Sequence, residues 1–160
     1  METKFEIVPV PTRILTHHDD IVEAIVEYGG DKIGPDDVVC VAESVVAITQ
    51  GGAKRSEDFK PGLLAKVLCR LFPSKGSISG WHSMQALIDA EGGMRVLIAV
   101  ICGFAAKCVG VSGVFYRMAG EQARLIDDVT GTMPPYDKHI VYGPHNPSKV
   151  AEEITSGTCA

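Results

Sequence analysis

Apolar and polar positions follow the period of an α-helix in four segments of the chain. Between residues 21 and 28, apolar side chains recur on one helix face, and the polar residues Thr16 or Asp19 could cap the helix start. The same spacing predicts helices over residues 63–72, 81–90 and 147–154, the last with Asn146 as cap and Pro147 at its first position.

Four shorter runs predict β-strands, at residues 5–10, 38–42, 95–102 and 139–142. The run at 95–102 is the most apolar, so we expect it in the middle of a sheet. Residues 115–125 could be helical around Gly120, whereas 104–113 suit neither element clearly. Because helices and strands alternate, the sequence predicts an α/β to α+β fold, a mixed sheet with helices on its faces, in a single domain over residues 1–160.

Length and charge restrict the classes of partner. The chain has 160 residues, of which 46% are hydrophobic and 22% charged, as in an ordinary globular domain. A net charge of −5 gives no general attraction for nucleic acid or for a membrane surface, so we expect small-molecule partners. No signal peptide or membrane-spanning run is visible, which makes the cytoplasm the expected location.

The acidic pair Asp127 and Asp128 is a candidate metal site. It lies in the segment IDDVTGT at 126–132, where carboxylates in a glycine-containing loop could bind a hard divalent cation. A solvated turn with a local side-chain cap is the alternative interpretation.

Two further groups of residues could bind an anion. Glu43, Ser44, Gln50 and Gly51 follow an apolar run, as ligand-binding residues do at the carboxyl end of a strand, although Glu43 or Ser44 could equally cap a helix. The cations Lys107, Arg117 and Arg124 precede the acidic loop and could receive phosphates or carboxylates, unless they form a solvated face.

The order of these segments resembles the coenzyme F-420-0:L-glutamate ligase family, the gamma-glutamyl ligases. The stretches that carry the resemblance are IVPV at 7–10, THHDDIVEA at 16–24, DDVVCVAESVVA at 36–47, IDD at 126–128 and PHNPSKVAEEI at 144–154. The stretches WHSMQ at 81–85 and PPY at 134–136 are similar to a less characterised ligase-like branch. The resemblance covers nearly the whole chain and corresponds to the first part of such a ligase.

The resemblance implies an enzyme that uses GTP and a divalent metal, Mg or Mn, to couple a carboxylate to L-glutamate. By position, Asp127 matches the metal-proximal aspartate of the family and Asp128 its acidic neighbour. A homodimer, or a second chain supplying the remaining half, is expected as partner. Ser44 and Ile48 stand where the ligases favour lysine, so a non-catalytic binding or assembly module with the same fold is the alternative function.

Overall fold

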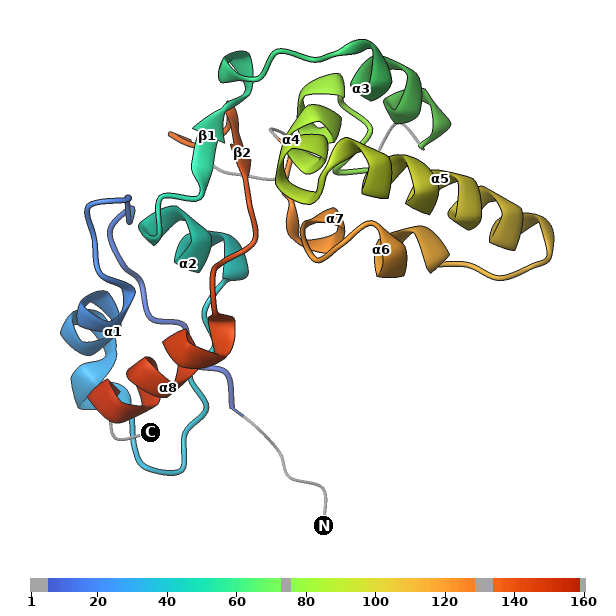
Figure 1. The fold of residues 1–160 in the computed structure, drawn as a ribbon. Helices are drawn as coiled ribbons and strands as arrows, with labels where there is room; N and C mark the ends of the chain where they lie inside the picture. The colour runs from blue at the N-terminus through green and yellow to red at the C-terminus, as the bar shows by residue number, and fades with distance from the viewer. Residues whose placement is uncertain (1–5, 73–75, 129–133, 159–160) are drawn as a thin grey trace.

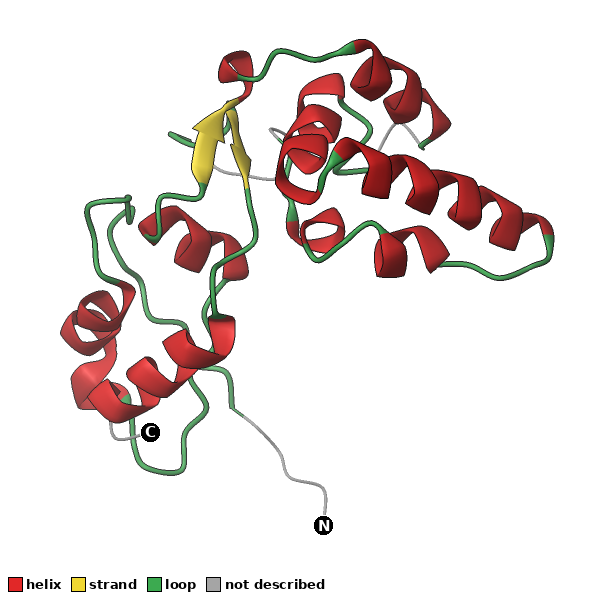
Figure 2. Cartoon of the chain, viewed as in Figure 1, coloured by secondary structure: helices red, strands yellow, loops and turns green. Residues whose placement is uncertain are grey.

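The computed structural model describes residues 6–72, 76–128 and 134–158. Its ribbon separates into a smaller lobe with α1, α2 and α8 and a larger lobe with α3 to α7, and the strands β1 and β2 run between them (Figure 1). Helices dominate both lobes, and the strands are short (Figure 2). No helix among the described residues is long and apolar enough to cross a membrane.

Three helices form the smaller lobe: α1 (Ile21–Gly29), α2 (Glu43–Thr49) and α8 (Pro147–Thr158). Their apolar faces meet in one cluster that contains the buried side chains of Ile21, Val46, Val150 and Ile154. The first and last parts of the chain therefore pack together, as α1 and α8 do side by side in Figure 1. Residues 21–28 and 147–154 were predicted as helices, and both predictions are confirmed.

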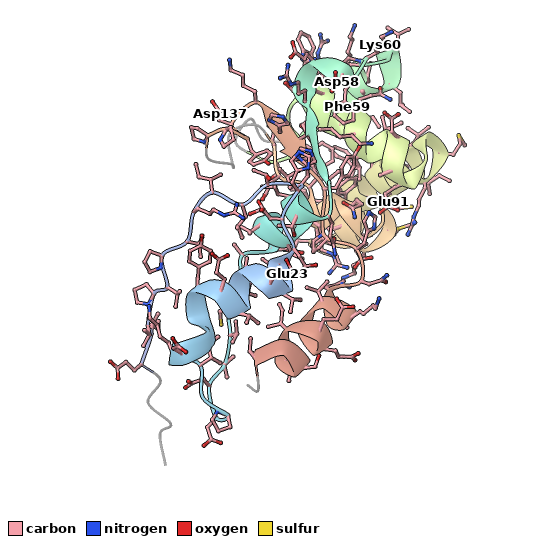
Figure 3. All side chains as sticks on the ribbon, turned by 90° about the vertical axis from the view of Figure 1, so that its left-hand side faces the viewer. Glu23, Asp58, Phe59, Lys60, Glu91 and Asp137 are labelled. Carbon is pink, nitrogen blue, oxygen red and sulfur yellow. The ribbon has the colours of Figure 1, made fainter. Side chains whose placement is uncertain are left out.

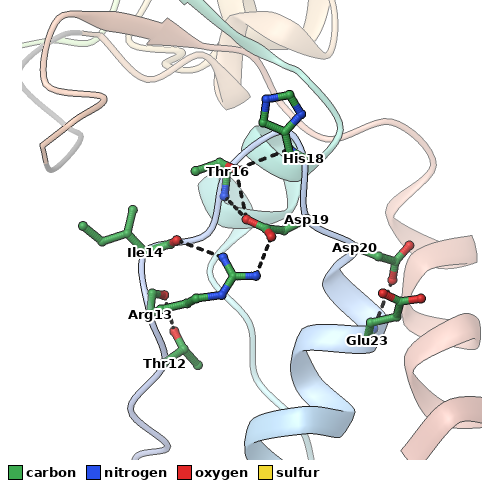
Figure 4. A network of polar contacts seen from close by, with 8 residues as sticks. All are labelled: Thr12, Arg13, Ile14, Thr16, His18, Asp19, Asp20 and Glu23. Atoms are coloured by element: carbon green, nitrogen blue, oxygen red, sulfur yellow. Dashed lines mark hydrogen bonds and ion pairs between the residues drawn. The ribbon is translucent and has the colours of Figure 1, made fainter.

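Asp19 and Asp20 both accept hydrogen bonds in the turn where helix α1 begins (Figure 4). The Asp20 carboxylate caps the helix, accepting hydrogen bonds from the backbone N–H groups of Val22 at 2.8 Å and Glu23 at 3.0 Å. Asp19 instead pairs with Arg13 and accepts from Thr16, and these contacts hold the pKa of its carboxyl far below the usual range. Asp20, and not the predicted Thr16 or Asp19, is therefore the cap.

Five helices form the larger lobe: α3 (Leu63–Leu68), α4 (Trp81–Glu91), α5 (Gly93–Cys108), α6 (Val114–Met118) and α7 (Gln122–Leu125). A 3-10 turn extends α3 over Cys69–Leu71, so the predicted helices at 63–72 and 81–90 are confirmed. The largest fully buried side chains of its core include Met84, Leu87, Val96, Ile126 and Ile140.

The two strands form an antiparallel ladder that joins the lobes. β1 (Ala53–Arg55) pairs with β2 (His139–Val141), and Val141 also forms an antiparallel bridge to Asp127. Val141 is buried against Ala47 and Ile48 of α2, which seats the end of that helix on the sheet. The strand predicted at 139–142 is thus confirmed, in a helix-rich fold with one small antiparallel sheet, consistent with an α/β or α+β class.

Other strand predictions are wrong. Residues 95–102 belong to helix α5, where Val96, Ala99 and Val100 are buried at helical spacing. Residues 38–42 form no strand: Val39 and Val41 pack on the smaller core, whereas Val38 is 73% exposed. Residues 6–10 likewise form no strand, and Phe5 lies outside the described residues. A continuous apolar run has no period of its own, which is why the α5 segment was assigned to the wrong element.

Candidate functional site

The residues predicted around α2 occupy its two ends. Glu43 and Ser44 form its first turn, with Glu43 exposed and Ser44 half-buried. Gln50, just beyond the helix, uses both halves of its amide on the backbone of His145: Nε2 donates to the carbonyl at 3.0 Å, and Oε1 accepts from the N–H at 2.6 Å. Gly51 continues the turn with φ +77°. Gln50 therefore fastens the chain before α8 to the end of α2.

Asp127 faces the same side of the sheet as α2. Its backbone N–H donates to Val141 at 2.9 Å and its carbonyl accepts from Val141 at 3.0 Å. Directly paired residues on antiparallel strands share one face of a sheet, and on this face Val141 contacts Ala47 and Ile48. Burial raises the pKa of the Asp127 carboxyl above its usual range.

The adjacent Asp128 points the other way, into an open cavity of about 440 Å³ that we call the Asp128 cavity. Consecutive side chains in an extended segment leave opposite faces, so the two carboxylates do not converge. The Asp128 cavity lies between the 3-10 turn Ser56–Asp58, helix α3 with its extension, and the start of α4. The side chains in its wall that can carry positive charge are Lys66, Arg70 and His82, beside the ring of Trp81.

Gly80 lets Asp128 approach the start of α4 closely. A Cβ atom at Gly80 would lie 3.0 Å from Asp128 Oδ2 and 3.0 Å from Ser83 Oγ, closer than almost all real contacts. Ser83 is fully buried and donates to the Gly80 carbonyl at 3.1 Å, so it cannot retreat easily. A side chain at position 80 would therefore require the Asp128 carboxylate to shift by a few tenths of an ångström.

A second cavity, of about 430 Å³, lies between residues 77–78 and the pair α6 and α7. We call it the arginine cavity, because Arg117 of α6 and Arg124 of α7 both line it, together with Tyr116. Two of the three cations predicted to gather are thus brought together. Lys107 lies in the last turn of α5 and, among the described residues, does not line this cavity.

The side chains of the Asp128 cavity suit a metal that the protein and a bound substrate ligate together, and not a metal ligated by protein side chains alone. In the parts of the chain that the structure describes, no three His, Cys, Asp or Glu side chains cluster as ligands. Mg²⁺ usually takes one or two protein carboxylates and completes its shell with water and substrate phosphates. In such a site Asp128 would supply the carboxylate, and the neighbouring cations are suited to the phosphates.

The sequence prediction missed Lys66, Arg70 and His82. Lys66 and Arg70 are four residues apart in the predicted helix 63–72, which places them on one helix face, and this spacing was the available signal. Nothing in the sequence alone links that face to Asp128, which is about sixty positions away along the chain.

The chain was compared with protein families, with curated proteins and with solved structures. A sequence model of the family described as F420-0:Gamma-glutamyl ligase matches residues 9–158. No curated protein and no solved structure matches the chain. Because the family match covers nearly the full sequence and agrees with the order of segments noted above, the chain belongs to the F420-0:gamma-glutamyl ligase family.

Proposed function

We propose that this protein takes part in a gamma-glutamyl ligase reaction, in which a nucleoside triphosphate and a divalent metal activate a carboxylate that is then joined to L-glutamate. Family membership supports the reaction class. The observation that supports this location of the site is the Asp128 cavity, whose lining contains one carboxylate, Asp128, together with Lys66, Arg70 and His82. GTP with Mg²⁺ or Mn²⁺ is the proposed combination of cosubstrate and metal.

The reaction has two steps. Transfer of the terminal phosphoryl group to the substrate carboxylate breaks a phosphoanhydride bond and leaves an acyl phosphate and the nucleoside diphosphate. The glutamate amine then attacks the acyl carbon, the C–O bond to phosphate breaks, and the amine loses a proton as the amide forms. Both steps concentrate negative charge on phosphate oxygens, so catalysis depends mainly on positioned cations.

The residues of the Asp128 cavity have distinct proposed roles. Lys66 and Arg70 bind phosphate oxygens, since neither forms an ion pair within the described parts of the chain. Asp128 holds the metal that bridges those phosphates, and Asp127 supports the segment from the sheet side. The exposed ring of Trp81 offers a flat surface against which a planar ring of the substrate or nucleotide could stack.

Self-association of the protein, which the family resemblance leads us to expect, is supported by one face of α5. Its large apolar side chains are unusually exposed: Met94 is 71%, Ile101 60% and Phe104 66% exposed. Exposed apolar area of this kind typically marks a contact with another polypeptide. We therefore propose that α5 packs against a second copy of the chain.

The non-catalytic alternative is favoured by one position. Ile48, which stands where the ligases favour lysine, is 7% exposed and packs with Ala47 and Val141. This position therefore offers a ligand no cation. In this alternative the protein keeps the binding cavities and assembles with a partner without performing the transfer.

Product formation distinguishes the two functions. The purified protein is incubated with F420-0, GTP, Mn²⁺ and L-glutamate, and the products are followed by mass spectrometry. The proposal predicts a glutamylated product and GDP with the wild type, and loss of both with Asp128→Asn. Arg55→Gln, which alters an exposed ion pair on β1, is the matched control and should keep full activity. If the wild type forms no product under these conditions, that result contradicts the ligase proposal and favours the non-catalytic function.

A further inference from the structure

The arginine cavity has features of a second anion site, separate from the Asp128 cavity. Arg117 and Arg124 come from different helices but line the same space, over a floor that includes the buried side chains of Ile78 and Ala123. Within the described residues, neither guanidinium forms an ion pair. Two positive charges that face one cavity without an acid favour the entry of an anion.

An ion pair between Glu91 and Arg95 contacts the two helices that carry these arginines. Glu91, at the end of α4, accepts from the backbone N–H of Gln122 at 2.9 Å and from Arg95 at 2.8 Å. Arg95 Nε in turn donates to the Met118 carbonyl at 3.0 Å. The Glu91–Arg95 ion pair therefore links the end of α6 to the start of α7 through hydrogen bonds. Figure 3 shows Glu91 inside the larger lobe.

The chain between α6 and α7 passes close to the Glu91 carboxyl group. Gly120 has φ +112°, and a Cβ there would lie 2.0 Å from the Glu91 carboxyl carbon. Ala119 and Ala123 on either side are buried. Arg117 and Arg124 thus extend from a corner fixed by packing and by hydrogen bonds, which limits the ordering that a ligand must impose.

We propose that Arg117 and Arg124 form an oxyanion subsite, assisted by the Tyr116 hydroxyl, for the carboxylate of a small acceptor such as an amino acid. This use rests on the proposed ligase function, since that reaction needs a place for L-glutamate beside the activated carboxylate. Guanidinium groups suit this role because their paired N–H donors match the two oxygens of a carboxylate. A phosphate group has the same chemistry, so the subsite could receive phosphate as well.

Binding can be measured without nucleotide, metal or turnover. The intact 17.1 kDa chain is titrated with L-glutamate, and separately with inorganic phosphate, while backbone amide NMR signals of Ser77 and Gly113 are followed. We expect saturable shifts at both residues. Arg117→Gln and Arg124→Gln should each weaken binding about tenfold or more, as expected for loss of a charged hydrogen bond. Arg55→Gln, on strand β1 and outside the lining of both cavities, is the control and should bind as the wild type does.

Each result has a defined meaning. Saturation by glutamate alone supports a carboxylate subsite, and saturation by both anions supports a general oxyanion subsite. Absence of saturable binding, or equal affinity in the wild type and both arginine variants, overturns the subsite. Because turnover is not measured here, that failure leaves the ligase reaction standing, whereas a protein that binds glutamate but forms no product disproves only the reaction.

Discussion

Replacing Glu91 tests the corner that presents the two arginines. The Glu91 side chain is 11% exposed, and Glu91→Ala would remove the acceptor for both Gln122 N–H and Arg95. The Arg95 part is worth roughly 0–1 kcal/mol, because that side chain is 55% exposed and water can solvate it. The hydrogen bond from Gln122 lies in partly buried surroundings, and bonds to charged groups contribute about 1.5–3 kcal/mol. Together these values predict a loss of about 1.5–4 kcal/mol in the free energy of unfolding.

Urea denaturation followed by the fluorescence of Trp81, the single tryptophan, measures this loss. Glu91→Gln retains an acceptor oxygen for Gln122 and should lose about half as much. Glu57→Ala is the matched control: it removes the partner of Arg55 in an ion pair whose two side chains are 65% and 75% exposed. We expect this control to stay within about 0.5 kcal/mol of the wild type. If Glu91→Ala costs no more than Glu57→Ala, the corner is not held in the way described.

Three other predictions concern stability. Gly110→Ala, at φ +82° in open space, should lower the free energy of unfolding by about 1–2 kcal/mol. Gly120→Ala should lower it by about 1–3 kcal/mol more, because its Cβ would overlap Glu91. Equal melting temperatures for the two variants would contradict that contact. Asp127→Asn should stabilise the metal-free protein at pH 7, because the raised pKa of Asp127 means that folding disfavours its ionised form. The gain in the free energy of unfolding should vanish below about pH 4, where Asp127 is protonated in both states. A gain that does not change between pH 3 and 7 would refute the raised pKa. Burial and the charge of Asp89 raise the pKa of Tyr142 to about 12. The neutral Tyr142 side chain should therefore stabilise the fold fully below about pH 10, and this stabilisation should be lost as the pH rises through 12. In alkaline unfolding experiments, Tyr142→Phe should not show this loss of stability.

The helices with a clear polar face were predictable from the sequence, whereas α5 was not. In α5 the buried Val96, Ala99 and Val100 alternate with exposed Met94 and Ile101, so apolar residues lie on both faces and conceal the period. Residues 38–42 have the composition of a strand, but the fold provides no neighbouring strand among the described residues. In both segments, tertiary packing decides what local composition leaves open.

The candidate site was predictable in part. Asp128, as part of an acidic pair, and Arg124, as a cation before that pair, are candidates visible in the sequence, and both line cavities in the structure. Gln50 was expected to bind a ligand, and its amide instead bonds to the His145 backbone. The partners Lys66 and Arg70 reach Asp128 only through the packing of α3 on α4, a long-range contact that no local pattern encodes.

Metal binding in the presence of nucleotide tests the central claim most directly. Mn²⁺ is titrated calorimetrically into the protein saturated with GTP, for the wild type, Asp128→Asn and Asp127→Asn. If the Asp128 cavity holds the metal and nucleotide phosphates, the wild type binds Mn²⁺, Asp128→Asn weakens binding about tenfold or more, and Asp127→Asn weakens it less. Equal Mn²⁺ affinity in the wild type and Asp128→Asn would contradict the placement of the site in this cavity.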